Sequence, residues 1–131
     1  MASRPQRFRA VRQRAASFGH AFRGVRMALA TELHLQFHAG ATVAVVALGF
    51  YFHLARWEWA LVALAVGAVW SAELLNTAVE AIVDLVSPQY HPLAGRAKDI
   101  AAGAVLVVAL GALVVGGLIF GPRLWALWVG F

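Results

Sequence analysis

Four polar side chains recur on one side of a predicted helix that is otherwise apolar. The run AELLNTAVEAIVD contains Glu73, Asn76, Glu80 and Asp84. At 100° per helical residue they lie at about 0°, −60°, −20° and +20°, so all four share one narrow stripe. A carboxylate that faces hydrocarbon is penalised by about 2.5–3.5 kcal/mol on insertion scales. Carboxylates are kept in such a position where they bind a cation or another charged group. The stripe is therefore the candidate functional site of the chain.

The stripe offers hard oxygen ligands, and positive groups follow it along the chain. Carboxylates suit Mg²⁺, which often binds through one or two protein carboxylates while substrate phosphates complete its coordination shell. Glu32 is expected at the same level of the membrane as Glu80, and Arg96 and Lys98 can neutralise phosphate oxygens during phosphoryl transfer. Glu73 lies about two helical turns deeper, where a desolvated carboxylate can accept a proton from a lipid hydroxyl. Geometry alone favours Glu73 as a base and Glu80 as a metal ligand.

The elements that must position these residues are membrane helices. The chain is 62% hydrophobic, has a mean hydropathy of +0.74 and contains no cysteine. A soluble domain is typically about 45–50% apolar. We therefore predict an all-α integral membrane protein that forms one domain over residues 1–131. Its predicted transmembrane helices are residues 39–55, 59–86 and 97–120.

The distribution of basic residues predicts the orientation of these helices. Seven of the eleven Lys and Arg residues precede Met27, and two more follow the second predicted span. The positive-inside rule then places the N-terminus and the second loop in the cytoplasm, with the acidic half of the second span beside them. Residues from about 4 to 35 are predicted to form an amphipathic helix on the anionic cytoplasmic leaflet. The alternative is that this basic segment is only a topology signal.

Several classes of function lack their sequence signals. The chain has no Walker loop, no GxGxxG motif after a strand and no HExxH motif. His34 and His38 are four residues apart, but a third metal ligand is missing nearby, so we interpret both as interfacial polar residues. The basic arm has little aromatic interleaving, which favours a membrane surface over nucleic acid as its partner.

The run from Glu73 to Asp84, followed by Tyr90-His-Pro-Leu-Ala-Gly-Arg-Ala-Lys98-Asp99, resembles the signature of the prokaryotic diacylglycerol kinase family, which includes undecaprenol kinases. The resemblance extends over most of the chain. It implies three transmembrane helices and a surface helix, assembled as a homotrimer with active sites between subunits. It also implies that Mg²⁺ and ATP are used to phosphorylate a lipid alcohol at the cytoplasmic face of the bacterial inner membrane.

The resemblance also implies roles for single residues. Glu73 matches the catalytic base of the family, and Glu32 and Glu80 match its metal-binding acids. Asn76 and Asp84 fall on polar positions of the same helix. The ATP-binding positions are matched by Glu32, Glu80, Gln89, Tyr90, His91, Lys98 and Asp99.

Two further features bear on the substrate. In the surface helix, Gly24 and Arg26 match a recurrent G-x-R, which assigns Arg26 to substrate contact. Pro92 in the second loop and His38 after the surface helix resemble the undecaprenol kinase branch more than the diacylglycerol kinase branch. Undecaprenol is therefore the favoured substrate, and diacylglycerol stays the alternative.

Other interpretations of the same residues remain open from the sequence. The intramembrane acids could form a proton or cation path in a small transporter-like oligomer. The kinase is favoured because a path needs polar groups through the whole bilayer, and the first half of the second span is apolar. A membrane scaffold without activity is the third possibility. Locally, Asp84 could pair with Arg96, and Lys98 with Asp99.

Overall fold

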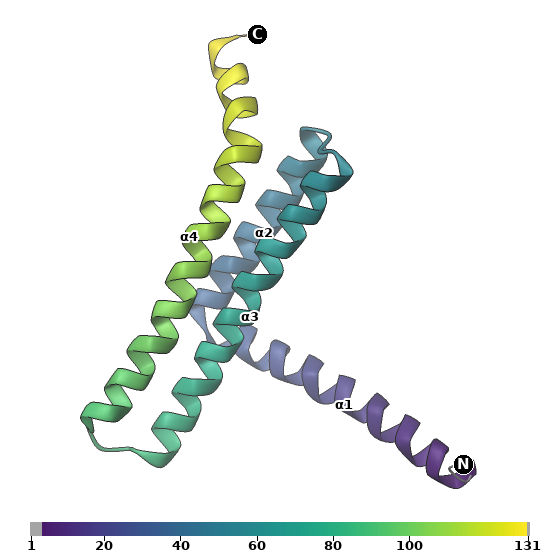
Figure 1. The fold of residues 1–131 in the computed structure, drawn as a ribbon, viewed down its shortest axis with the longest axis vertical. Helices are drawn as coiled ribbons and strands as arrows, with labels where there is room; N and C mark the ends of the chain where they lie inside the picture. Colours follow the sequence, from purple (N-terminus) through teal and green to yellow (C-terminus); the bar gives the residue numbers. More distant parts are fainter. Residues whose placement is uncertain (1–3, 131) are drawn as a thin grey trace.

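The computed structural model of the chain consists of long helices joined by short connections (Figure 1). It describes residues 4–130, and the side chains from residue 17 onward. Over this range the chain has no strand and forms four helices: α1 (Arg4–Thr31), α2 (Leu33–Tyr51), α3 (Arg56–Val86) and α4 (Pro92–Val129). By length and composition, α2, α3 and α4 are each able to cross a membrane. The predicted all-helical chain with three such helices is confirmed.

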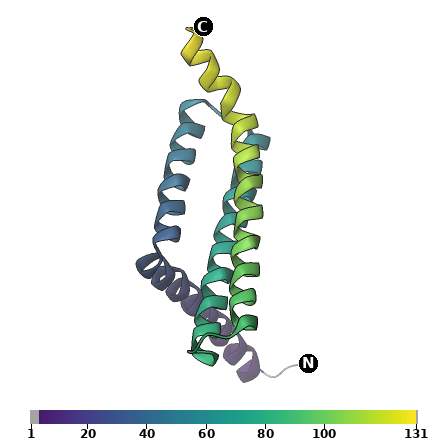
Figure 2. The same ribbon diagram turned by 90° about the vertical axis from the view of Figure 1, so that its left-hand side faces the viewer.

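The predicted helix over residues 4–35 is divided at Glu32. This residue has an extended backbone (φ −99°, ψ 115°), so α1 ends before it and α2 starts after it. The Thr31 hydroxyl donates to the Glu32 carboxylate over 3.0 Å, and Gln36 Nε2 donates across the break to the Leu29 carbonyl over 3.2 Å. α1 therefore leads away from the other helices in Figure 1, and in Figure 2 it recedes behind the lower ends of α3 and α4.

The last helix is longer than the apolar segment predicted over residues 97–120. It begins at Pro92, whose fixed φ suits the first helical position, and the His91 side chain caps it by accepting from the Leu93 backbone N–H over 3.2 Å. It continues through Pro122 to Val129, and its end extends beyond the connection between α2 and α3 (Figure 1).

The three apolar helices pack mainly along α3. The α3–α4 contact is the most extensive, α2 packs against α3, and α1 makes only small contacts with α2 and α3. The buried apolar cluster is Leu54, Val62, Ile119 and Phe120, which lie near the α2–α3 connection. A cluster of buried apolar side chains therefore holds this end of the molecule together.

An ion pair reinforces the same end of the molecule. Arg123 of α4 binds Glu58 in the first turn of α3 at 2.9 Å, and the Glu58 side chain is only 7% exposed. The Glu58 carboxylate also accepts from the Ala55 backbone N–H over 2.9 Å, which satisfies a donor at the start of α3. A carboxylate buried to this extent needs such partners, so α3 and α4 are joined here by charge as well as by packing.

A tight contact between Gly49 of α2 and Trp59 of α3 predicts a stability effect at this glycine. A Cβ atom there would lie 2.6 Å from Cη2 and 2.8 Å from Cζ2 of Trp59. We expect Gly49→Ala to lower stability by about 1–3 kcal/mol, the usual cost of overpacking, seen as a lower midpoint of thermal unfolding in detergent. Gly67→Ala is the matched control, since nothing lies within 4 Å of a Cβ at that helical glycine. Equal midpoints for the two variants would contradict the tight contact.

Candidate functional site

The acid stripe lies on α3, and its two middle members bind each other. Asn76 Nδ2 donates to Glu80 Oε1 over 2.9 Å, the expected contact for side chains one turn apart. The other amide oxygen, Asn76 Oδ1, is buried and has no hydrogen-bond partner. An unsatisfied buried polar atom costs about 1–3 kcal/mol. Asn76 is thus linked to Glu80 through its amide nitrogen, while its amide oxygen is buried with no hydrogen-bond partner among the described residues.

The deepest acid of the stripe has a partner that the sequence did not reveal. Glu73 Oε1 lies 2.9 Å from Nε2 of His38, and the Glu73 side chain is 7% exposed. The sequence pattern indicates an interfacial polar residue at His38, whereas the structure places its ring against Glu73. Both residues lie about four to five helical turns from the α2–α3 connection. That similar depth is the signal that could have paired them.

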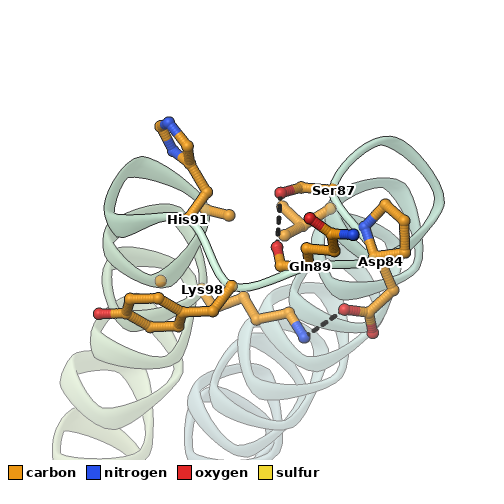
Figure 3. A pocket seen from close by; sticks show the side chains of 10 residues that line it. Asp84, Ser87, Gln89, His91 and Lys98 are labelled. Atoms are coloured by element: carbon orange, nitrogen blue, oxygen red, sulfur yellow. Dashed lines mark hydrogen bonds and ion pairs between the residues drawn. The ribbon is translucent and has the colours of Figure 1, made fainter.

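The last acid of the stripe belongs to a pocket at the α3–α4 connection (Figure 3). Lys98 Nζ of α4 reaches across the pocket to Asp84 Oδ1 of α3 at 2.6 Å. The lysine therefore pairs with Asp84, which replaces both local pairings left open by the sequence, Asp84 with Arg96 and Lys98 with Asp99. The pocket is lined by Val83, Asp84, Ser87, Pro88, Gln89, Tyr90, His91, Ala94, Gly95 and Lys98.

The connection that forms this pocket is shaped by its own polar groups. Ser87 Oγ donates to the Gln89 carbonyl over 3.1 Å, and His91 caps α4. Tyr90 is 91% exposed, so its ring is available to a ligand at the mouth of the pocket. Four of the sequence-predicted ATP-binding residues therefore surround one hollow: Gln89, Tyr90, His91 and Lys98.

Other predicted site residues are not gathered with these. Arg26 is exposed on α1, and Asp99 is exposed on α4 outside the lining of the pocket. Glu32 is half-buried at the α1–α2 break, where its recorded side-chain contact is with Thr31. Among the described residues, no group of three or more His, Asp or Glu side chains is close enough to hold a metal ion.

Comparison with known proteins assigns this arrangement to a family. Residues 19–120 match the family described as prokaryotic diacylglycerol kinase.

Three relatives illustrate the range of similarity. The chain is 49% identical over 108 residues to a Bacillus subtilis protein named undecaprenol kinase, covering 82% of this chain and 88% of the relative. It is 45% identical over 114 residues to a Synechocystis protein named diacylglycerol kinase, covering 86% of this chain and 65% of the relative. It is 31% identical over 96 residues to an Escherichia coli K12 protein named diacylglycerol kinase, covering 73% of this chain and 79% of the relative. Together with the apolar helices and the acid stripe, these matches show that the chain belongs to the prokaryotic diacylglycerol kinase family and is a membrane lipid kinase.

Proposed function

We propose that the chain transfers the γ-phosphoryl group of ATP to the hydroxyl of a membrane lipid, with Mg²⁺ bound, and that Glu73 is the general base. Undecaprenol is the favoured lipid and diacylglycerol the alternative, since relatives bear both names. The observation that carries the proposal is the buried Glu73 carboxylate, which shares one face of α3 with the oxygen atoms of Asn76 and Glu80. Such a site offers a proton acceptor beside oxygen ligands.

The reaction needs a base at the attacking oxygen. The lipid hydroxyl attacks the γ-phosphorus in line, Glu73 accepts its proton, and ADP leaves as the bond to its β-phosphate oxygen breaks. Because Glu73 is 7% exposed, its carboxylate is largely shielded from water, which reduces competition from hydrolysis. The products are the lipid phosphate and ADP.

The donor set around Asn76 fits a hard cation. Carboxylate and amide oxygens are ligands that Mg²⁺ prefers, and Asn76 Oδ1 is buried without a partner beside Glu80. We assign Glu80 and Glu32 as the metal-binding acids, with Asn76 and Asp84 as the polar residues beside them. When bound, the ion would offset negative charge on the transferring phosphoryl group.

The pocket at the α3–α4 connection is the proposed nucleotide side of the site. Lys98 is the cation that phosphate oxygens would meet there, and its ion pair with Asp84 keeps its ammonium group over the pocket. Gln89, Tyr90 and His91 line the same hollow, and Asp99 follows Lys98 on α4. We assign all five residues to ATP binding.

Removal of the lysine charge tests this assignment. We expect Lys98→Met to raise KM for ATP by about 10–100-fold, because a hydrogen bond between charged groups contributes about 1.5–3 kcal/mol. The measurement is the initial rate against ATP concentration at saturating lipid. Arg96→Met is the matched control: the sequence offers Arg96 as a second group that could neutralise phosphate, but it lies on the same helix outside the pocket. An unchanged KM in Lys98→Met would remove the lysine from the ATP site.

We further propose that three copies assemble in the inner membrane, with the N-terminus and the site on the cytoplasmic side. Within the described part of one chain, three of the proposed site residues make no hydrogen bond or ion pair with the others: Arg26, Glu32 and Asp99. In an assembly, a neighbouring copy would bring its own residues to complete the site. Large apolar side chains also remain exposed along the membrane helices, as surfaces facing lipid or another copy would be. In this arrangement α1 lies on the cytoplasmic leaflet, and its Arg26 contacts the substrate.

The decisive experiment is phosphoryl transfer by the purified chain in lipid nanodiscs. Equal amounts of undecaprenol or diacylglycerol are supplied with γ-labelled ATP and Mg²⁺, and labelled lipid is separated by chromatography. We expect label in undecaprenol phosphate at the higher rate. Faster labelling of diacylglycerol would reverse the substrate assignment, and an absence of label in both lipids would overturn the proposed function.

A further inference from the structure

A contact between α2 and α3 holds one oxygen atom of the proposed base. His38 Nε2 lies 2.9 Å from Glu73 Oε1, and the two side chains are 21% and 7% exposed. A carboxylate removed from water this far is costly unless a donor compensates it. Within the described residues, no Lys or Arg forms an ion pair with Glu73. The imidazole of His38 is therefore its compensating group.

A second contact fixes where His38 lies relative to Glu73. The Thr42 hydroxyl accepts from the Trp70 indole N–H over 3.1 Å and donates to the His38 carbonyl over 2.7 Å. Thr42 follows His38 by one helical turn, and Trp70 precedes Glu73 by nearly one turn. α2 and α3 run in opposite directions (Figure 1), so a residue one turn later on α2 meets a residue about one turn earlier on α3, and the two contacts are neighbours. Together they set the register of α2 against α3 at the level of the base.

The second carboxylate oxygen of Glu73, Oε2, is the one left to act as a base. Within the described part of the chain, Oε1 lies 2.9 Å from His38 Nε2, while no hydrogen bond or ion pair involves Oε2. A carboxylate can accept a proton at either oxygen, and a glutamate side chain that is free to rotate presents both at random. A donor fixed on Oε1 therefore selects Oε2 as the atom that faces the substrate.

We propose that His38 is a positioning residue for the lipid kinase reaction: its Nε2–H holds Oε1 of Glu73 so that Oε2 accepts the proton of the lipid hydroxyl. This inference rests on the proposed role of Glu73. A base held in one orientation contributes to rate through proximity, since even about 1 Å of misplacement can cost about 10²-fold. His38 itself neither binds phosphate nor takes the proton, so its loss should act on kcat more than on KM.

The test compares three variants in the nanodisc assay with undecaprenol. His38→Ala removes the donor, and we expect kcat to fall about 10–100-fold with little change in KM for ATP. His38→Gln places an amide N–H at a similar reach from the backbone and should restore most of the loss. His34→Gln, one turn earlier on α2 and exposed, is the matched control and should behave as wild type. Wild-type kcat in His38→Ala, or equal losses in His38→Ala and His38→Gln, would overturn the proposal.

A measurement without turnover separates this proposal from the proposed function. In protein carrying isotopically labelled histidine, we expect the His38 ring nitrogen signals to shift in Glu73→Gln and to stay in place in Glu80→Gln. If the His38 ring nitrogen signals do not change in Glu73→Gln, the contact between His38 and Glu73 does not form, whatever the activity. An inactive wild type with signals that respond to Glu73→Gln would instead overturn the proposed reaction and leave the pair established.

Discussion

Glu73→Gln is expected to lower kcat for lipid phosphorylation by about 10²–10⁴-fold, the contribution usual for a general base. The substitution keeps the size and the hydrogen-bonding capacity of the side chain, but an amide oxygen cannot take up the proton of the lipid hydroxyl. KM for ATP should change little, because the pocket proposed for the nucleotide lies around Asp84, toward the end of α3. The measurement is the initial rate of label transfer from ATP to undecaprenol in nanodiscs.

The structure offers a matched control on the same helix. The Glu58 side chain is 7% exposed, like that of Glu73, but Glu58 lies in the first turn of α3 and is bound by Arg123. Glu58→Gln should lower the midpoint of thermal unfolding while kcat stays near wild type. If Glu73→Gln and Glu58→Gln lose activity equally, the loss reflects the removal of a buried charge, and Glu73 is not the base.

The second large effect is expected at Glu80. Glu80→Ala removes the proposed metal-binding carboxylate one helical turn from Asn76, so we expect at least about a 10–100-fold loss of rate and a higher Mg²⁺ requirement. The measurement is a Mg²⁺ titration of the initial rate, accompanied by the mass of the assembly from light scattering. The mass should stay that of wild type. A loss of assembly in parallel with activity would mean that Glu80 serves helix packing instead.

Variants of the neighbouring amide sharpen this test. Asn76→Asp keeps an oxygen atom that can bind a metal ion one turn from Glu80. Asn76→Leu removes that oxygen at similar side-chain volume. We expect Asn76→Asp to retain a Mg²⁺-dependent rate that Asn76→Leu loses. Equal Mg²⁺ curves for the two variants would show that the buried Oδ1 atom is not a ligand.

What the sequence predicted well were features set by helical periodicity within one segment. Glu73, Asn76 and Glu80 share a stripe because 100° per residue brings every third or fourth side chain to the same face. The contact between Asn76 and Glu80 in the structure follows from that spacing alone. The apolar content of α2, α3 and α4 likewise depends only on local composition.

Contacts between helices could not be read in the same way. Whether Asp84 meets Lys98 or Arg96 depends on the path of the connection over residues 87–91, and a difference of two positions on α4 turns the side chain by about 200°. His38 and Glu73 pair because of the register of α2 against α3, to which the Thr42–Trp70 contact contributes. Such registers depend on tertiary packing.

Two helix ends also departed from their sequence signals. The break at Glu32 occurs where neither glycine nor proline is present, and it depends on one residue with an extended backbone. Conversely, Pro122 does not end α4. Arg123, next to it, donates to the carbonyl of Ile119 and binds Glu58, so tertiary contacts hold the helix beyond the proline.

The apolar cluster around Leu54 and Phe120 has a practical consequence for engineering. It lies with the Glu58–Arg123 pair near the α2–α3 connection, whereas Glu80 and Lys98 lie toward the opposite ends of α3 and α4. Stabilising substitutions often impair function when they stiffen a site that must stay adaptable. Here the packing that stabilises the fold and the residues of the proposed site occupy separate stretches of the same helices. Thermostable variants can be selected by redesigning the cluster while the half that carries the proposed site is left untouched.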